Sequence, residues 1–355
     1  MIARNDRRPQ NGRADADLVP THTSNLRQPM TLRLSKFLAA AACIVSSAQV
    51  YADPPWHSTV LEVQGPQGPL QGTLLAPAGA TSNKAAVLIV PGSGPTDRDG
   101  NGASGLQAGS YRLLAEGLAM QGVATLRIDK RGLFGSGSAV SNPNNVTIGA
   151  YADDVARWVS ALRQRSQAPC VWVLGHSEGG VVALAAAPRV PEICGLVLLA
   201  TPGRRIGQVL RAQLAANPAN APVLDQAFGA IDALEAGRRV DVATFHPALQ
   251  SLFRPAVQGF LMDSFAVDPA QLAASTTVPI LIVQGDQDLQ VLVEDARLLE
   301  AGAAGHARLV MLAGMNHVLK TVPTGDRAAN LASYRREDLP LAAGLVDAIV
   351  EFVGR

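Results

Sequence analysis

A serine between two glycines is the strongest chemical signal in the sequence. Residues 175–179 read Gly-His-Ser-Glu-Gly, which matches the pattern G-x-S-x-G with Ser177 at its centre. The apolar run Cys-Val-Trp-Val-Leu comes directly before it, and a helix-like run that begins Val-Val-Ala-Leu follows it. In that context the glycines permit a tight turn between strand and helix, which lifts the serine hydroxyl above the end of a sheet. The pattern therefore predicts that Ser177 is a nucleophile.

A serine hydroxyl needs a histidine base, and a carboxylate must orient that base. In this architecture the chain order is serine, acid, histidine. Of the six histidines, only His317 follows a late apolar run, 307–312, at the edge of the sheet where Ser177 is expected. Elimination and chain order therefore select His317 as the base. His176, next to the serine, is expected to shape the turn.

The acid is expected after the apolar run 279–283, where the sequence reads Gly-Asp-Gln-Asp. Two aspartates compete for this role. We favour Asp288, because the loop must leave its strand before it turns back toward the histidine. Asp286 is expected to cap or stiffen the turn, a common role for an aspartate next to glycine.

An acyl-transfer site also needs two backbone donors for the oxyanion. One is the amide of Glu178, directly after the nucleophile. The other is expected in the loop 91–95, Pro-Gly-Ser-Gly-Pro, where glycine permits a close approach of the backbone. Within that loop Ser93 is the favoured donor. The side chain of Glu178 is expected to be an acid in the first helical turn, which the helix dipole favours.

The elements that position these residues follow from hydropathy. A hairpin of 59–64 and 70–76 comes first, and six nearly continuous apolar runs follow it. Such runs are typical of strands buried on both faces of a parallel sheet, and the helix-like stretches between them indicate βαβ units. The clearest helix is 147–165, with an apolar stripe behind a capping Thr147. The six runs are 85–90, 123–128, 170–174, 195–199, 279–283 and 307–312.

One interval is too long for a simple crossover. Residues 202–277 carry helical patterns broken by prolines, whereas a bare connection needs far fewer residues. We predict a helical cap inserted between the sixth and seventh strands. Its apolar side chains suggest a pocket for an acyl chain, with packing inside the cap as the alternative.

The N-terminal residues are expected to lie outside the fold. Residues 1–29 are polar without a hydrophobic period, as in a disordered tail or an upstream start that precedes the true first residue, Met30. Residues 30–52 then have basic residues, an apolar run and small residues before Ala52, the pattern of a signal peptide. The apolar run is shorter than the roughly 20 residues that span a bilayer. We therefore predict export to the periplasm or beyond, and a mature domain of 53–355.

The three cysteines bear on the same prediction. A lipoprotein anchored through Cys43 is the less favoured alternative to a cleaved signal peptide. Cys170 and Cys194 stand at the amino ends of consecutive predicted strands, which places them within disulfide range if the register matches. In an oxidising compartment such a pair is expected to close. The alternative is two buried free thiols.

Composition narrows the classes of function. The chain has 355 residues, 48% of them hydrophobic and 17% charged, as in a globular protein. A net charge of +1 and 4% aromatic residues provide neither the field nor the stacking surface for nucleic acid. The cysteines show no metal-binding spacing. We expect no metal, no nucleic-acid partner and no stable membrane span after removal of the signal peptide.

Five segments in this order, PGSGPTDRDGN, DKRGLFGSG, GHSEGG, GDQDLQV and GMNHVLK, resemble the α/β-hydrolase superfamily, and in combination its bacterial serine carboxylesterases. The resemblance covers about 60–353. It implies the α/β-hydrolase fold with an eight-stranded, mostly parallel sheet, and a triad of Ser177, Asp288 and His317. It also implies that no cofactor is needed and that the substrate is a small acyl ester.

One departure from that family concerns the oxyanion loop. Many members have His-Gly where this chain has Pro91-Gly92, so the loop must be held in another way. Two charged loops, 96–101 and 129–132, are expected at the same edge of the sheet. They either pair with each other and brace the oxyanion loop or are two solvated turns, because surface ion pairs contribute little.

The favoured function is hydrolysis of small carboxylic esters through an acyl-enzyme. A capped aminopeptidase is the first alternative, and it would need acidic side chains in the cap that face the serine. Glu235, Asp241 and Asp263 are the candidates for that role. A binding protein that keeps the fold without catalysis is the remote alternative, since the complete set of catalytic residue types argues against it.

Overall fold

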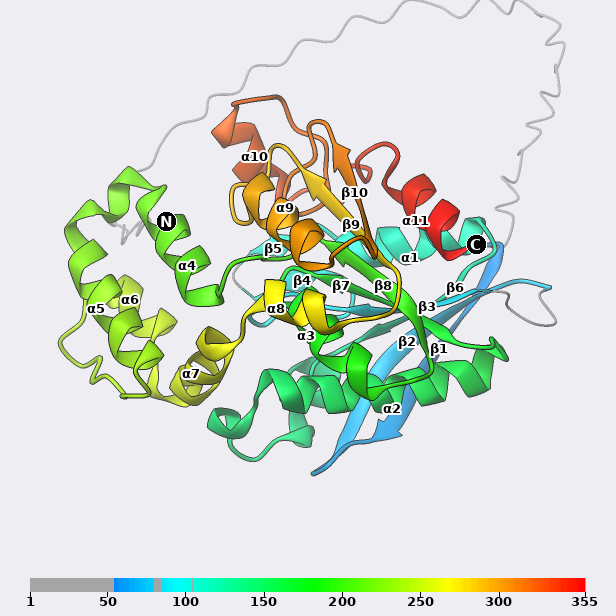
Figure 1. Ribbon diagram of the computed structural model, residues 1–355, viewed down its shortest axis with the longest axis horizontal. Coiled ribbons are helices and arrows are strands. Elements are labelled where there is room, and N and C mark those ends of the chain that lie inside the picture. Colours follow the sequence, from blue (N-terminus) through cyan, green and yellow to red (C-terminus); the bar gives the residue numbers. More distant parts are fainter. Residues whose placement is uncertain (1–53, 80–84, 104, 355) are drawn as a thin grey trace, which may run out of the picture. The chain divides into compact units, whose positions relative to one another are not determined.

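The computed structural model describes residues 54–79, 85–103 and 105–354 (Figure 1). The chain divides into two units, 1–52 and 53–355, and the described residues belong to the second. The predicted tail, the signal peptide and Cys43 lie outside the described residues. Among the residues described, no helix combines the length and the apolar character needed to cross a membrane.

Eight strands form one sheet in the order β1, β2, β6, β3, β7, β8, β9, β10 (Figure 1). β1 pairs with β2 and β2 with β6 in antiparallel fashion, and all other neighbours are parallel. This confirms the predicted mostly parallel sheet of eight strands. The strands are β1 (Trp56–Gln64), β2 (Pro69–Pro77), β3 (Ala86–Val90), β6 (Ala124–Ile128), β7 (Val171–His176), β8 (Ile193–Leu199), β9 (Ile280–Gly285) and β10 (Ala307–Leu312).

Helices cover both faces of the sheet because the central strands are apolar on both sides. In β3, Leu88 belongs to the core under α2, α3 and α9, whereas Ile89 belongs to the core under α1 and α11. Two short strands of two residues each, β4 (Asn101–Gly102) and β5 (Leu106–Gln107), form a hairpin before α1. The sequence does not predict this hairpin. The covering helices are α1 (Ser110–Met120), α2 (Ile148–Ser166), α3 (Glu178–Ala186), α9 (Val293–Gly302) and α11 (Leu345–Val353).

The predicted helix 147–165 is α2. Thr147 caps it, since its hydroxyl oxygen accepts a hydrogen bond of 2.9 Å from the amide of Ala150. The predicted apolar stripe is buried against the sheet, and Trp158 at its centre is fully buried. The spacing of apolar residues and the capping residue therefore both predict this element correctly.

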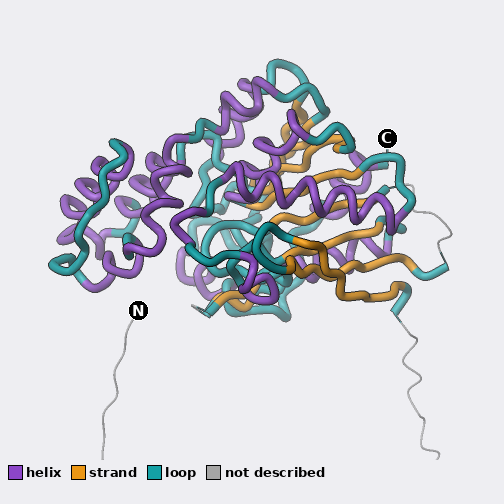
Figure 2. The backbone as a smooth tube through the Cα atoms, turned by 90° about the horizontal axis from the view of Figure 1, so that it is seen from below, coloured by secondary structure: helices purple, strands orange, loops and turns teal. Residues whose placement is uncertain are grey.

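The chain between β8 and β9 is helical, as predicted for 202–277, and we call this insertion the cap. In Figure 2 its helices form a group beside the strands, with no strand among them. Prolines begin its elements, as Pro247 and Pro269 do, because the first turn of a helix needs no amide donor. Phe253 and Phe265 belong to a separate apolar core inside the cap. The cap helices are α4 (Ile206–Ala215), α5 (Leu224–Glu235), α6 (Pro247–Leu252), α7 (Gln258–Ala266) and α8 (Pro269–Ser275).

A disulfide joins Cys170 to Cys194, with 5.3 Å between the two Cα atoms. Cys170 comes directly before β7, and Cys194 lies in the adjacent parallel strand β8. The register shifts at this point, because Val171 pairs with Ile193 and Trp172 with Gly195. Cys194 is the extra residue of this irregularity. The predicted bond is confirmed.

The disulfide should stabilise the fold mainly by restricting the unfolded chain. Replacing both Cys170 and Cys194 by alanine should lower the free energy of unfolding in urea by ~3 kcal/mol. Reduction of the unaltered protein should give the same loss, which is the control. Thiol labelling in denaturant without reductant, followed by peptide mapping, should leave both cysteines unlabelled. Labelling of either one would contradict the bond.

Candidate active site

Ser177 stands at the turn between β7 and α3 in a conformation that side chains rarely adopt, with φ of 52° and ψ of −123°. The two glycines of the motif make this turn possible. A Cβ at Gly179 would collide with the carbonyl oxygens of Val90 and Pro91, and one at Gly175 would collide with the backbone of Gly179. The turn is therefore strained at the serine and closely packed at both glycines, as the motif predicts.

Asp288 and His317 are in direct contact, with 2.8 Å between Oδ2 of Asp288 and Nδ1 of His317. They come from the loops after β9 and β10, and both are buried. The carboxylate can only accept, so Nδ1 of His317 carries the proton and Nε2 is the basic nitrogen. The amides of Gln290 and Val291 donate to the other oxygen of Asp288, at 2.7 and 3.0 Å. The carboxylate is thus fixed toward the histidine.

Asp286, the rejected aspartate, has the structural role expected of it. Its Oδ1 accepts a hydrogen bond of 2.7 Å from the amide of Gly314. This contact joins the turn after β9 to the turn after β10, which are the two loops that carry Asp288 and His317. Asp286 therefore holds these loops together without reaching His317 itself.

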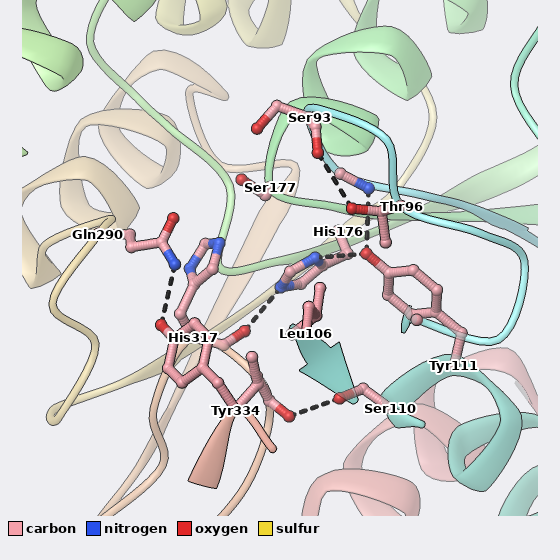
Figure 3. Close-up of a pocket in the computed structure, with 13 residues that line it drawn as sticks. Ser93, Thr96, Leu106, Ser110, Tyr111, His176, Ser177, Gln290, His317 and Tyr334 are labelled. Carbon is pink, nitrogen blue, oxygen red and sulfur yellow. Dashed lines mark hydrogen bonds between the residues drawn. The ribbon is translucent and has the colours of Figure 1, made fainter. Parts of the chain in front are cut away.

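Ser177 and His317 line the same cavity of about 470 Å³, which we call the small cavity (Figure 3). Within the described part of the chain, neither the hydroxyl of Ser177 nor Nε2 of His317 has a hydrogen-bond partner, so the two do not bond to each other either. Catalytic hydrogen bonds of this kind often form only in the complex with substrate. Among the residues that the structure describes, no lysine, arginine, aspartate or glutamate lines this cavity.

Hydrogen bonds fix the backbone of the loop at Gly92 and Ser93 but do not use the amide of Ser93. The amide of Gly92 donates to the hydroxyl of Tyr111 at 3.0 Å, and Nζ of Lys130 donates to the carbonyl of Gly92 at 2.6 Å. The hydroxyl of Thr96 donates to the carbonyl of Ser93 at 3.1 Å. Among the described residues, the amide of Ser93 has no acceptor. It is therefore free for a substrate oxygen.

The amide of Glu178 is also without an acceptor in the part of the chain that the structure describes. Ser93, Ser177 and Glu178 line one cleft together. A Cβ at Gly92 would lie 3.2 Å from Cβ of Ser177, so the loop passes directly against the nucleophile. The residues that carry the two predicted oxyanion donors therefore border the same cleft as Ser177.

The side chain of Glu178 lies at the start of α3, as predicted, and it also forms an ion pair with Lys130. Its Oε1 is 2.7 Å from Nζ of Lys130, and both side chains are buried, with exposed fractions of 6% and 3%. No spacing or pattern in the sequence predicts this ion pair. The charged segment that contains Lys130 was the available signal, but nothing local indicates that Glu178 would be its partner.

His176 connects the base to the oxyanion loop (Figure 3). Its Nε2 is 2.8 Å from the carbonyl oxygen of His317, so Nε2 must carry a proton. Nδ1 then accepts from the hydroxyl of Tyr111, also at 2.8 Å. The pKa of His176 is lowered to about 3, mainly by burial and secondly by electrostatic repulsion from His317. The ring is therefore neutral. His176 shapes the site as predicted, whereas Tyr111 was missed because it lies 65 residues away in sequence.

The two charged loops do pair with each other. Arg98 and Asp129 are 2.5 Å apart, and the amide of Arg98 donates to the same carboxylate at 2.9 Å. Asp99 also lies 3.1 Å from the buried Arg127. The alternative of two solvated turns is wrong, because the carboxylate of Asp129 is almost fully buried, with an exposed fraction of 2%.

A larger cleft of about 1120 Å³ lies between Ser177 and the cap, and we call it the cap cleft. The apolar residues of the cap have two kinds of position. Some line this cleft, whereas Leu249 and Phe253 pack inside the cap. The cleft lining includes Leu252, Phe260, Leu261 and Phe265, and Phe265 also belongs to the cap's own core.

Comparison with known proteins agrees with this geometry. Residues 87–333 match the Alpha/beta hydrolase family. Esterase EstD of Thermotoga maritima is 28% identical over 274 residues, which cover 76% of this chain and 62% of EstD. The chain thus spans less than two thirds of the length of that relative.

Solved structures share the fold at low sequence identity. The Pyrococcus furiosus esterase Pf2001 has a TM-score of 0.51 at 18% identity, over 75% of this chain and 85% of its own. Est1E from Butyrivibrio proteoclasticus has a TM-score of 0.51 at 17% identity, over 82% and 99%. The Pyrococcus horikoshii acylaminoacyl peptidase has a TM-score of 0.51 at 12% identity, over 85% and 42%.

The family match covers more than half of the chain, and the sheet order, the strained serine turn and the loops after β9 and β10 agree with it. The chain belongs to the alpha/beta hydrolase family.

Proposed function

We propose that this protein hydrolyses carboxylic esters through an acyl-enzyme on Ser177. The observation that carries the proposal is the buried Asp288–His317 pair, whose histidine lines the same cavity as the unpartnered hydroxyl of Ser177. Relatives that carry the name esterase, EstD among them, support the choice of ester as the substrate class.

In the proposed reaction, Nε2 of His317 takes the proton of Ser177 as its oxygen attacks the ester carbonyl. Asp288 stabilises the imidazolium that results. The carbonyl oxygen becomes negative and is bound by the amides of Ser93 and Glu178. His317 then gives the proton to the alcohol oxygen, and the alcohol leaves. Water, activated by His317, attacks the acyl-enzyme and releases the acid and the free serine.

Because His317 must donate a proton to the leaving group, its position indicates which part of the ester each cavity holds. The group that leaves must lie beside His317, which donates to it. His317 lines the small cavity but not the cap cleft, whereas both oxyanion donors line the cap cleft. The alcohol therefore occupies the small cavity and the acyl chain extends into the cap cleft. The apolar wall of that cleft suits an acyl chain.

A capped aminopeptidase is the weaker candidate, because recognition of a free amine needs an available carboxylate. Glu235 pairs with Arg211 at 2.9 Å. Asp241 accepts from the amide of Ala243, and Asp263 accepts from the amide of Ile148. None of the three lines the small cavity or the cap cleft.

We also propose that the chain is exported. The disulfide between Cys170 and Cys194 supports this, because such bonds persist in oxidising compartments and are rare in the cytosol.

Replacing Ser177 by alanine should remove hydrolysis of 4-nitrophenyl butyrate by a factor of about 10³ or more, since the nucleophile is lost and only binding and the oxyanion donors remain. The circular dichroism spectrum and the melting temperature should show a folded protein. Activity within tenfold of the unaltered enzyme would exclude Ser177 as the nucleophile.

The two aspartates should differ widely. An amide at position 288 can donate to Nδ1 of His317, which moves the proton to Nε2 and removes the base. Asp288→Asn should therefore lower kcat by about 10⁴-fold. Asp286→Asn keeps an oxygen that accepts from Gly314, so its kcat should fall by less than about tenfold. Steady-state kinetics of both variants decide the matter, and the reverse ranking would assign the acid to Asp286.

Tyr111→Phe should lower kcat by about tenfold or more, because the amide of Gly92 and Nδ1 of His176 both lose their partner and His317 is less well positioned. Tyr334→Phe is the matched control. It lines the same cavity, but its hydroxyl accepts from Gln290 rather than joining His176. We expect a loss of less than about threefold there. Equal losses in kcat would show that cavity polarity, not the link to His317, explains the effect.

A further inference from the structure

A third cavity of about 700 Å³, which we call the side cavity, adjoins the cap cleft. The two share part of their walls, so the shared residues form the junction between the cap cleft and the side cavity. The shared residues are Gly94, Pro95, Arg254, Val257 and Phe260. Arg254 is the charged residue at this junction.

In the part of the chain that the structure describes, three cationic side chains line these two cavities, and two of them are paired with carboxylates. Lys130 pairs with Glu178 at 2.7 Å. Arg131 makes two contacts of 2.6 Å with the carboxylate of Asp154. Among the residues described, no carboxylate pairs with the side chain of Arg254. Its charge is therefore the one left uncompensated at the junction.

The surrounding charges favour an anion there. Glu178, already paired with Lys130, is the only acidic residue in the described lining of the cap cleft, and the side cavity has none. Arg254 is itself exposed, so its attraction for an anion is partly screened by water and salt. An arginine in such a place binds a carboxylate through two parallel hydrogen bonds.

We propose that Arg254 binds a carboxylate at the far end of the acyl chain, so that the preferred substrates are half-esters of dicarboxylic acids. This rests on the proposed esterase function and on the acyl chain lying in the cap cleft. An anion on the alcohol has no such partner, because the small cavity is lined by no lysine or arginine in the described residues.

The test compares matched substrates. Mono-4-nitrophenyl esters of adipic, pimelic and suberic acid are paired with 4-nitrophenyl alkanoates of the same chain length. Shorter half-esters are avoided, because they cyclise to anhydrides without enzyme. The quantity measured is the ratio of kcat/KM for each half-ester to that of its alkanoate, which cancels general effects of a variant on the enzyme.

Arg254→Gln should lower this ratio by about 3–10-fold, mainly through KM, and Arg254→Glu should lower it further. The difference should shrink in high salt, because the charge is exposed. Arg238→Gln is the matched control. It removes the same charge from the same cap, but Arg238 lines none of the three cavities, so its ratio should equal that of the unaltered enzyme.

A third arm places the anion on the leaving group, in 4-butanoyloxy-3-nitrobenzoate compared with 4-nitrophenyl butyrate. This ratio should not respond to Arg254→Gln. A ratio for half-esters that is the same in Arg254→Gln as in the unaltered enzyme would overturn the inference, as would a loss confined to the leaving-group anion. Both results leave the esterase function standing. If the unaltered protein hydrolyses no ester at all, the proposed function fails and the inference fails with it.

Discussion

The ammonium group of Lys130 joins the two segments that carry the proposed oxyanion donors. It lies 2.6 Å from the carbonyl of Gly92 and 2.7 Å from the carboxylate of Glu178. Gly92 precedes one proposed oxyanion donor and Glu178 carries the other, so one buried cation sets the spacing between the two amides. Removing a partner of a buried pair leaves an uncompensated charge. Here that charge would be a carboxylate beside a developing oxyanion. Lys130 and Tyr111 also explain how the loop that begins Pro91-Gly92 is held.

The rest of the site is a set of loops at one edge of the sheet, tied to each other rather than only to their own strands. His176, at the end of β7, holds the backbone of His317 after β10 at 2.8 Å. Asp286, after β9, holds the amide of Gly314 after β10 at 2.7 Å. Because loops after three strands are cross-linked by hydrogen bonds, Asp288 and His317 are supported by contacts from outside their own loops. Supporting contacts of this kind hold the side chains of a site in position.

Much of this could be predicted from sequence, because the relevant signals are local. Continuous apolar runs indicate buried parallel strands, and a glycine-flanked serine between strand and helix indicates the turn at Ser177. Chain order then points to Asp288 and His317. What sequence reasoning missed depends on contacts between distant segments: the hydroxyl of Tyr111 on His176, the pairing of Lys130 with Glu178, and the division of the cap's apolar residues between cleft and core. No periodicity or spacing encodes which polar side chains meet across a sheet edge.

The disulfide lies at the opposite ends of the strands from the site, yet it encloses the nucleophile. Cys170 and Cys194 are 24 residues apart, and Ser177 with the whole of α3 lies between them. This segment is therefore a covalent ring. A single cut by a protease within the ring would leave the two pieces linked, so the serine turn would not separate from β8. Damage of this kind would be a nick in the backbone rather than the loss of a fragment.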